Sequence, residues 1–408
     1  MAGTPRPFDG LLVLDLGQIY QGPYAGFLLA MAGATVVKIE PPGGEPLRRR
    51  ALAASGAGVP MAMLNSNKKC LALDLKHPAG REVFLRLADR ADVLIENFAP
   101  GSMDKLGLGA AALQARNPRL VYAAASGYGQ TGRDAHNLAM DITVQAASGI
   151  LHCTGFPDGP PVKCGPAVVD FLGGAHLYGA IVTALFERER TGRGRAVEVA
   201  MQDAAYPALA SNLGMFFGGG RGKVPPRTGN RHGGLSMAPY NVYRAADGWV
   251  AVISVTEEHW RGLLRAMGRE DLLDDPRFAT NAARVARMAE VDGMVEDWMR
   301  GLTRAEAVAA AQRSGAPAAP VRDLEEVVND PHLHERGMLR WVDHPEVGRV
   351  ALPSSPLRFE GAPAPELVPS SPHNGDEAEV LGGMLGMSDA EREELRAAGA
   401  VGSRPGAA

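Results

Sequence analysis

One carboxylate stands out in this sequence because it begins a long apolar stretch. Between Pro166 and Phe186 the chain carries a single acid, Asp170, and a single histidine. The stretch follows a proline, is too long for a strand and ends in charged residues, so it predicts a mostly buried helix. Burial of a carboxylate is costly unless hydrogen-bond donors or a helix N-terminus offset it. Asp170 therefore indicates either chemistry or a specific structural role.

Two glycines, Gly173 and Gly174, follow this carboxylate. Each glycine in a helix interior costs about 1 kcal/mol relative to alanine, so the pair indicates that another group must approach closely. A structural alternative is that Asp170 caps a helix beginning at Phe171 and that the glycines admit a neighbouring helix. The stretch by itself leaves both interpretations open.

Length and composition indicate a globular protein of two or three domains. The chain has 408 residues, of which 22% are charged and 46% apolar, values that are ordinary for a globular fold. The formal net charge is -4 and the basic residues are scattered. We therefore expect no nucleic-acid partner.

Targeting and metal signals are weak in this chain. The first ten residues lack the regions of a signal peptide, and no apolar run is expected to reach the roughly 18 to 20 residues of a membrane span. We therefore expect no membrane association and, by default, a cytoplasmic location. Cys70, Cys153 and Cys164 are odd in number and lack metal-ligand spacing, so neither a disulfide framework nor a metal site is expected.

The first 126 residues alternate between strand and helix patterns. Strands are expected at residues 11–17, 35–40, 71–75, 92–98 and 119–126, with helices at 23–34, 77–91 and 108–117. Parallel strands need a crossover long enough to hold a helix. The alternation therefore predicts the α/β class with an open parallel sheet.

The second half predicts a smaller domain and a returning C-terminal segment. The glycine-rich residues 216–230 mark a boundary, and a hairpin is expected to turn at Asp247–Gly248. Helices follow at 257–268 and 288–302, and the alanine- and proline-rich residues 315–320 are expected to form a loop. We divide the chain into a large domain of residues 1–215, a small domain with linkers of residues 216–325, and a C-terminal segment of residues 326–408.

The glycines of the first βαβ unit do not form a dinucleotide fingerprint. Gly17, Gly22 and Gly26 are spaced too widely for G-x-G-x-x-G, and no P-loop follows any expected strand. A nicotinamide, flavin or ATP enzyme is therefore disfavoured. The paired Lys68 and Lys69 could meet phosphates, but a solvated surface is the commoner place for such a pair.

The chain resembles the class III coenzyme A transferase family, which includes formyl-CoA transferases and α-methylacyl-CoA racemases. Six segments carry the resemblance in this order: GPYAGFLLAMAGATVVKIEPPGG, NKKCLALDLK, ADVLIENFAPGSMDKLGL, GYGQTGRDAHNLAMD, GPAVVDFLGG and TGRGRAVEVAMQDA. VNDPHLHERGML and HPEVGRVALPSSPLRF are similar to the same family, so the resemblance covers nearly the whole chain. It implies a large Rossmann-like domain, a smaller α+β domain and a homodimer whose two chains interlock like rings.

The resemblance implies transfer of CoA from an acyl-CoA to a free carboxylic acid. Asp170 matches the family's nucleophilic aspartate, which forms an acyl anhydride and then an aspartyl-CoA thioester. CoA is the co-substrate, and no other cofactor is implied. The carboxylate must be ionised to attack, and we expect a nearby helix N-terminus to favour that form. Backbone N–H groups near Gly165 or Gly174 could stabilise the oxyanion.

A second set of residues falls where relatives of this family hold CoA. Lys105 is a candidate phosphate partner, and Lys38 or Arg48 could replace an arginine that relatives carry where this chain has Pro41 and Pro42. The full set of candidate substrate and CoA contacts is Tyr20, Gln21, Leu73, Asp74, Leu75, Lys76, Asn97, Phe98, Lys105, Met140 and Asp141.

A reactive anhydride also requires a cover that excludes water. The residues TGNRHGGLSMAPY resemble the family's glycine loop, in which Gly233 and Gly234 would give the backbone freedom that a lid needs. An ordinary loop leading into the hairpin is the alternative interpretation.

Transferase and racemase are distinguished by the residue before Asp141. Racemases of the family have a histidine there that pairs with the aspartate as acid and base, whereas this chain has Met140. Transfer is therefore favoured unless His136 or His152 reaches the site. Asp141 could orient the pantetheine end or cap a helix near Ile142. A CoA-binding protein without catalysis is the third possibility.

Overall fold

The computed structural model describes residues 5–53, 58–219, 225–362 and 364–402, and these form two compact units. The first unit comprises residues 1–144, 166–205 and 328–408, and the second comprises residues 145–165 and 206–327. The large domain expected at residues 1–215 includes residues 145–165 and 206–215, which lie in the second unit. Part of the glycine-rich boundary expected at residues 216–230 falls outside the described residues.

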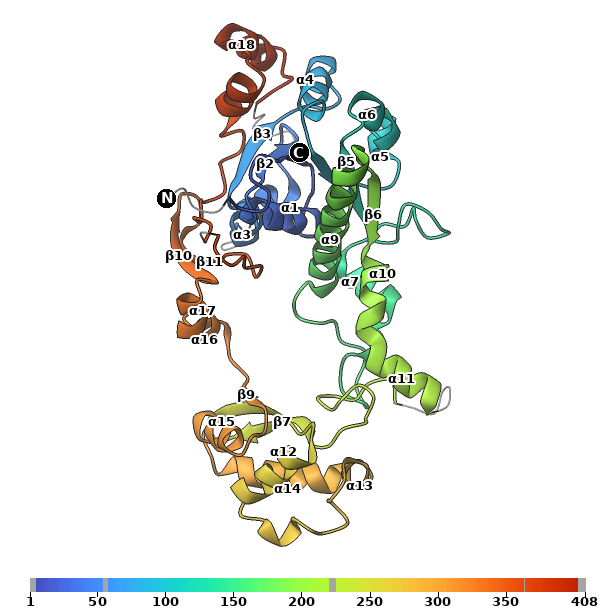
Figure 1. The fold of residues 1–408 in the computed structure, drawn as a ribbon, viewed down its shortest axis with the longest axis vertical. Helices are drawn as coiled ribbons and strands as arrows, with labels where there is room; N and C mark the ends of the chain where they lie inside the picture. Colours follow the sequence, from blue (N-terminus) through green and yellow to red (C-terminus); the bar gives the residue numbers. More distant parts are fainter. Residues whose placement is uncertain (1–4, 54–57, 220–224, 363, 403–408) are drawn as a thin grey trace. The chain divides into compact units, whose positions relative to one another are not determined.

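The first unit is built on a six-stranded parallel sheet, which confirms the expected α/β class (Figure 1). The strand order is β3-β2-β1-β4-β5-β6, so the order reverses between β1 and β4. In doubly wound sheets, ligands bind outside the carboxyl ends of the strands at such a reversal. The strands are β1 (Leu12–Asp15), β2 (Thr35–Glu40), β3 (Lys68–Ala72), β4 (Val93–Glu96), β5 (Val121–Ser126) and β6 (Ala196–Ala200).

Alternation along the strands divides the core of this unit into two layers. Val13 of β1 faces a cluster with Leu29 and Ile181, which belong to helices α1 (Gln21–Met31) and α9 (Val168–Thr191). Its neighbour Leu14 faces the other cluster with Phe84, from helix α4 (Pro78–Ala88). Successive side chains of a strand point to opposite faces, so both faces of the sheet are covered by helices.

The remaining elements of the first unit are short helices, one hairpin and the returning C-terminal segment. Val380 and Leu381 of that segment pack in the same cluster as Phe84. The elements are α2 (Pro46–Ala53), α3 (Val59–Asn65), α5 (Ser102–Lys105), α6 (Ala110–Arg116), α7 (Asp141–Ser148), which crosses into the second unit, α10 (Met201–Ala205), α17 (Pro331–Glu335), the hairpin β10 (Leu339–His344) and β11 (Gly348–Pro353), the π-helix Ala378–Met384, and α18 (Asp389–Ala397).

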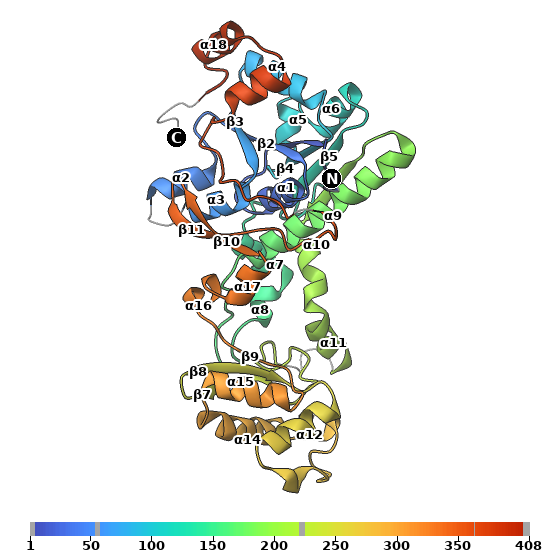
Figure 2. The ribbon, with the colours of Figure 1, turned by 60° about the vertical axis from the view of Figure 1, so that its left-hand side comes forward.

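The second unit packs helices on a three-stranded antiparallel sheet with the order β7-β8-β9 (Figure 2). Trp260, Val295 and Ala307 join its core from three helices. Its elements are α8 (Ile150–Cys153), a 3₁₀ turn at Tyr206–Leu209, α11 (Ala210–Gly218), β7 (Tyr240–Ala245), β8 (Gly248–Ile253), α12 (Glu257–Ala266), a 3₁₀ turn at Glu270–Leu272, α13 (Asn281–Val285), α14 (Met288–Arg300), α15 (Arg304–Arg313), β9 (Ala318–Pro320) and α16 (Leu324–Val328), whose last residue lies in the first unit.

The structure corrects two expected elements. Residues 318–320 were expected in a loop but form β9, because they pair with β8 from Val250 to Val252. The third strand was expected at residues 71–75 but spans Lys68–Ala72. Lys68 is only 4% exposed, because its ammonium group is paired inside the unit rather than hydrated.

Helix α9 also differs from expectation. It is long and apolar enough to span a membrane by length and composition, so the expectation that no apolar run reaches that length is wrong. The prediction of a mostly buried helix is wrong as well, because only one side of α9 packs on the sheet and Phe186 is 68% exposed. Ile181 lies in the core and the buried Arg188 pairs with Asp92 at 3.0 Å, contacts typical of a core helix.

A buried ion pair joins the last residue of β1 to the first residue of β3. Lys68 Nζ lies 2.7 Å from Asp15 Oδ2 and also donates to the carbonyl of Pro23 at 2.8 Å and to Asn65 Oδ1 at 3.1 Å. Burial opposes ionisation of Asp15, but the ammonium groups of Lys68 and Lys38 outweigh it and hold the pKa of Asp15 below its usual range. The pair therefore holds Asp15 in its charged form, whereas burial outweighs the attraction of Asp15 at Lys68 and lowers the pKa of that ammonium group to about 8.

We predict that Asp15→Asn lowers the free energy of unfolding by about 3–5 kcal/mol, because it leaves the Lys68 ammonium buried without its counter-charge. Urea denaturation measures the change. Asp89→Asn is the matched control, since Asp89 pairs with Arg116 on the surface and such pairs contribute about 0–1 kcal/mol. Equal losses in the two variants would contradict the prediction.

Candidate active site

A cavity of about 380 Å³ opens where the first three strands end. Gly17 and Gln18 follow β1, residues 41–45 follow β2, and residues 73–76 follow β3 along its wall. Four of the predicted CoA contacts, Leu73, Asp74, Leu75 and Lys76, therefore line one cavity. The carboxyl ends of parallel strands meet at one edge of a sheet, which is where α/β folds place nucleotides.

A second cavity of about 190 Å³ contains Asp170. The predicted contacts Gln21, Asn97, Phe98 and Met140 share its lining with the carboxylate. Segments as distant in sequence as residues 18–21 and 135–140 thus meet around one acid. In the sequence, only the family resemblance connects these residues.

Gln18 and Phe98 line both cavities, so the two cavities adjoin. Gln18 follows β1 and Phe98 follows β4, the two strands between which the sheet order reverses. The side chain of Asn97 joins the two loops: its Oδ1 accepts from the N–H of Gln18 at 2.7 Å, and its Nδ2 donates to the carbonyl of Gln18 at 2.9 Å. An elongated ligand could therefore run from the strand ends to Asp170.

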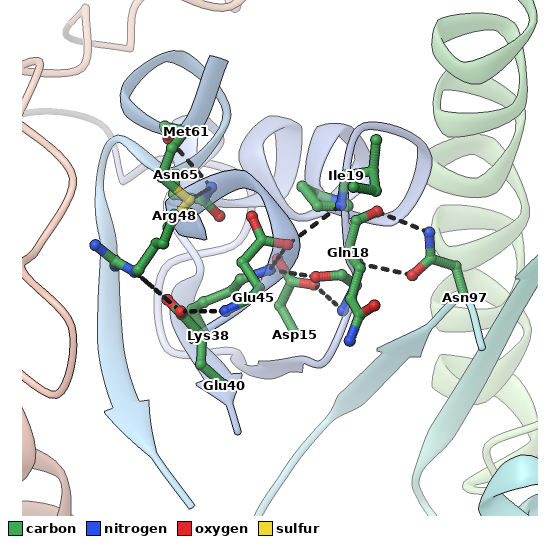
Figure 3. Close-up of polar contacts among 12 residues, drawn as sticks. Asp15, Gln18, Ile19, Lys38, Glu40, Glu45, Arg48, Met61, Asn65 and Asn97 are labelled. Carbon is green, nitrogen blue, oxygen red and sulfur yellow. Dashed lines mark hydrogen bonds and ion pairs between the residues drawn. The ribbon is translucent and has the colours of Figure 1, made fainter. Parts of the chain in front are cut away.

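Charged side chains hold the loop after β1 in place (Figure 3). Glu45 Oε2 accepts from the N–H of Ile19 at 3.2 Å and lies 3.8 Å from Lys38 Nζ. Lys38 also donates to the carbonyl of Gly17. Ile19 has a φ of 62°, a strained conformation for a β-branched residue. These contacts hold the loop in a shape that local preference would not give.

The N-terminus of α9 is occupied by a carboxylate from another segment. Asp141 Oδ1 accepts from the backbone N–H of Val169 at 3.0 Å and of Asp170 at 3.4 Å. These are N–H groups of the first turn, which have no acceptor within the helix. Asp141 therefore caps α9, whereas the sequence analysis had considered it as a cap near Ile142.

Asp170 is only 8% exposed, and its environment disfavours the charged form. Burial, and after it the nearby Asp141 carboxylate, raises the pKa of Asp170 to about 7. The expectation that the helix N-terminus would favour the ionised carboxylate is therefore wrong. The first reason is burial, which opposes ionisation; the second is that Asp141 accepts from two N–H groups of that terminus and adds a negative charge beside Asp170.

Tyr20 contacts the residue that follows Asp170 in the chain. Its ring stacks on Phe171, with centroids 5.9 Å apart and planes 20° apart, and Phe171 follows Asp170. Tyr24 meets Phe171 edge-on at 4.9 Å. This aromatic contact packs the start of α1 against the start of α9.

Three basic residues considered for CoA do not line the cavities. Lys38 is 1% exposed and engaged with Glu45, and Arg48 pairs with Glu40 at 2.9 Å. Lys105 is an exposed residue of α5 outside the lining of both cavities. Arg49 lines the larger cavity instead; its place in the run Arg48 to Arg50 was visible in the sequence, but which arginine faces inward was not.

The described lining of the Asp170 cavity contains no histidine. Met140 is present where a racemase would carry its second proton-transfer group, and His136 is exposed outside the lining. His152 belongs to the second unit. Within the described residues, no group of three or more His, Cys, Asp or Glu side chains is placed to hold a metal ion.

The predicted lid residues lie in the second unit. A Cβ atom added at Gly233 would lie 3.0 Å from Asn212 Oδ1, and one at Gly234 would lie 3.0 Å from the carbonyl of Ser211. Both glycines therefore allow the loop to pack closely against α11. The function of this loop as a lid stays a prediction.

Gln18 and Glu45 belong to the site but were not predicted from the sequence. Gln18 lies outside the segments that resemble the family. The only feature that indicates a role for it is its position directly after the expected first strand. Glu45 follows Gly43 and Gly44, a signal for a turn near the end of the second strand. Neither signal distinguishes a buried support or a cavity wall from a solvated loop.

Comparison with known proteins agrees with this geometry. The family described as CoA-transferase family III matches residues 8–378. The acetyl-CoA:oxalate CoA-transferase of Acetobacter aceti is 36% identical and aligns over 92% of this chain and 95% of its own length. The formyl-CoA:oxalate CoA-transferase of Streptomyces coelicolor is 34% identical over 98% of this chain and all of its own. A CAIB/BAIF family protein from Brucella suis has a TM-score of 0.80 at 33% identity, covering 93% of this chain and 100% of that protein.

We predict that Asp170→Asn stabilises the protein above neutral pH. The pKa of Asp170 is about 7 in the folded protein and near the ordinary 3.8 when unfolded, so its contribution to stability falls as the pH rises from about 4 to 7. The variant should raise Tm by ~2 °C or more at pH 8 and by less at pH 5. Thermal denaturation at both pH values measures this, with Asp134→Asn as an exposed-carboxylate control. A gain that is the same at both pH values would disprove the linkage.

Proposed function

This chain belongs to CoA-transferase family III, and from that premise we propose that Asp170 is the covalent nucleophile that moves CoA from an acyl-CoA donor to a small free carboxylic acid. The protein is an enzyme of the CoA-transferase class, which sets aside a CoA-binding protein without catalysis. The observation that carries the proposal is a buried carboxylate in a cavity that adjoins a second cavity at the nucleotide edge of the sheet.

The proposed reaction has four steps. The Asp170 carboxylate adds to the thioester carbonyl, the C–S bond breaks, and an acyl-aspartyl anhydride and the CoA thiolate result. The thiolate attacks the aspartyl carbonyl, which releases the donor acid and leaves an aspartyl-CoA thioester. The acceptor carboxylate attacks that thioester to form a new anhydride and free the thiolate. The thiolate then takes the acceptor acyl group and restores Asp170.

The two cavities support a binding mode for CoA. We place the nucleotide end in the larger cavity, where Arg49 and Lys76 supply cations for its phosphates. The pantetheine arm would pass Gln18 and Phe98, which line both cavities, and bring the thioester to Asp170. Acyl transfer of this kind changes no oxidation state, so we propose no cofactor beyond CoA as co-substrate.

The proposed chemistry requires a reactive carboxylate and an anhydride protected from water, and the burial of Asp170 fits both requirements. A poorly hydrated carboxylate is more reactive toward a carbonyl, and an anhydride formed away from water survives until the thiolate returns. The raised pKa means that at neutral pH a fraction of the enzyme holds a protonated, unreactive Asp170. Burial, and after it the Asp141 charge, therefore shifts the pH range of the reaction upward, while Asp141 also caps the start of α9.

For the acceptor acid we propose only a chemical class, and for the protein's assembly and location only a general description. Oxalate is named for both relatives, and we propose a small carboxylic acid for this enzyme, since the Asp170 cavity is about 190 Å³. We also propose an interlocked homodimer, a cytoplasmic location and a covering role for the loop of Gly233 and Gly234. The homodimer and the covering role rest on the family resemblance, whereas the cytoplasmic location is the default expectation from the sequence analysis.

We predict that Asp170→Ala lowers the rate of CoA transfer by at least about 10³-fold, because no other group in the scheme can form the anhydride. Formation of a new acyl-CoA, followed by mass spectrometry, measures the rate. Hydroxylamine added after the donor should modify Asp170 in the native enzyme and leave the variant unmodified. Retained transfer would disprove the mechanism, and exchange of an α-proton with deuterated water in the absence of an acceptor acid would indicate racemisation instead.

We predict that Asp141→Asn extends activity to lower pH. Asparagine keeps an oxygen that can cap α9 but removes the charge that raises the pKa of Asp170. The acidic limb of kcat/KM, expected near pH 7, should move to lower pH. Asp134→Asn removes an exposed carboxylate of the preceding loop and should leave the limb in place. An unchanged or higher midpoint in Asp141→Asn would contradict the assignment.

A further inference from the structure

Gln21 explains the two glycines of α9. It is the first residue of α1 and only 2% exposed. A Cβ atom at Gly173 would lie 2.6 Å from Gln21 Nε2, and one at Gly174 would lie 2.7 Å from the carbonyl oxygen of Gln21. Any larger residue at either position would collide with Gln21. The glycines thus make room for the glutamine, and α9 loses helix propensity for that purpose.

This arrangement brings the Gln21 amide to the reactive side of α9. Positions 170, 173 and 174 are related as i, i+3 and i+4, so they share one face of the helix. Gln21 lies against Gly173 and Gly174 on that face, and it lines the same cavity as Asp170. The carboxylate and the amide therefore face one volume of about 190 Å³.

The Gln21 amide is only weakly engaged by the protein. Its Nε2 lies 3.5 Å from the carbonyl oxygens of Ser126 and of Val199, at the long limit of a hydrogen bond. The amide of Asn97, in the same cavity, makes bonds of 2.7 and 2.9 Å to Gln18. Nε2 of Gln21 therefore gives up little hydrogen bonding when it donates to a better acceptor in the cavity.

A side chain that stabilises a negatively charged acyl oxygen in this cavity has to be a neutral hydrogen-bond donor. None of its described lining residues is a lysine, arginine or histidine. Addition of a carboxylate to a thioester places a negative charge on the former carbonyl oxygen, and enzymes stabilise that charge with fixed hydrogen-bond donors. A donor to a charged oxygen forms a bond about twice as strong as one between neutral groups, so the gain is largest in the transition state.

We propose that Gln21 is a catalytic residue that donates a hydrogen bond from Nε2 to the acyl oxygen. As the Asp170 oxygen bonds to the acyl carbon, the π electrons of the carbonyl move to that oxygen, which accepts the Gln21 N–H. The electrons return as the C–S bond breaks and the CoA thiolate departs, and the same donor serves each later addition at an acyl carbon. This inference rests on the proposed function of Asp170.

Gln21→Leu tests the donor directly. We expect kcat to fall about 10²-fold, while the Kd for CoA, measured by calorimetry, stays within about twofold. Gln21→Glu has the same shape but places an acceptor and a second negative charge in the cavity; at pH 8 it should also lose about 10²-fold in kcat, and its acidic limb should move to higher pH. Native kcat in either folded variant would overturn the proposal.

A matched pair of glycine variants tests the geometry without changing the glutamine. Gly173→Ala pushes on the far end of the Gln21 side chain, so it should displace Nε2 and lower kcat by about 10²-fold with little change in the Kd for CoA. Gly179→Ala is the control on the same helix, since a Cβ atom there would have no atom within 4 Å. Equal kcat values in the two variants would overturn the inference.

The outcome for Asp170 separates this inference from the proposed function. If Asp170→Ala keeps its transfer activity, the proposed function fails, whatever the Gln21 variants do. If Asp170→Ala is inactive while Gln21→Leu and Gly173→Ala both match the native kcat, only the role of Gln21 fails. A loss of thermal stability in the Gln21 variants with native kcat would assign Gln21 a packing role and would likewise overturn the proposal.

Discussion

The site depends on a loop that is held by buried charge. The Asp15–Lys68 pair and the contacts of Lys38 with Glu45 lie beneath the turn that follows β1. Buried charges cost free energy unless each has its partner, so this set tolerates few alternative arrangements. These charged groups hold Ile19 in a strained conformation. The loop that contains Ile19 places Gln18 at the junction of the two cavities. The position of this loop therefore depends on buried charged groups whose rearrangement would cost free energy.

A second constraint joins reactivity to stability at the start of α9. Asp141 satisfies backbone donors of the helix and at the same time disfavours the charged form of Asp170. The carboxylate that caps the helix is thus also one of the causes of the raised pKa of the proposed nucleophile. Sites that raise the pKa of a functional carboxyl group in this way give up folding stability in return for reactivity. The exchange is local, since it involves two carboxylates and one helix terminus.

Much of the fold followed from local patterns. The alternation of strands and helices over residues 11–126 predicted a parallel sheet, and the six-stranded sheet confirms it. Errors arose where a residue's partner lies far away in the chain. Lys68 was expected at a solvated surface because its counter-ion, Asp15, is 53 residues away. Residues 318–320 have the composition of a loop and become a strand only because β8 offers hydrogen-bond partners.

The sequence by itself determined the type of chemistry: an acid at the start of a long helix, followed by two glycines, within segments typical of one enzyme family. Only the tertiary structure decided which groups surround that acid. Asp141 and Gln21 reach α9 from 29 and 149 residues away in the chain. Burial and, after it, the Asp141 charge raise the pKa of Asp170, and the close approach of Gln21 explains the glycines. Local sequence carries helix propensity and burial pattern, whereas electrostatic neighbours and close approaches depend on distances that exist only after folding.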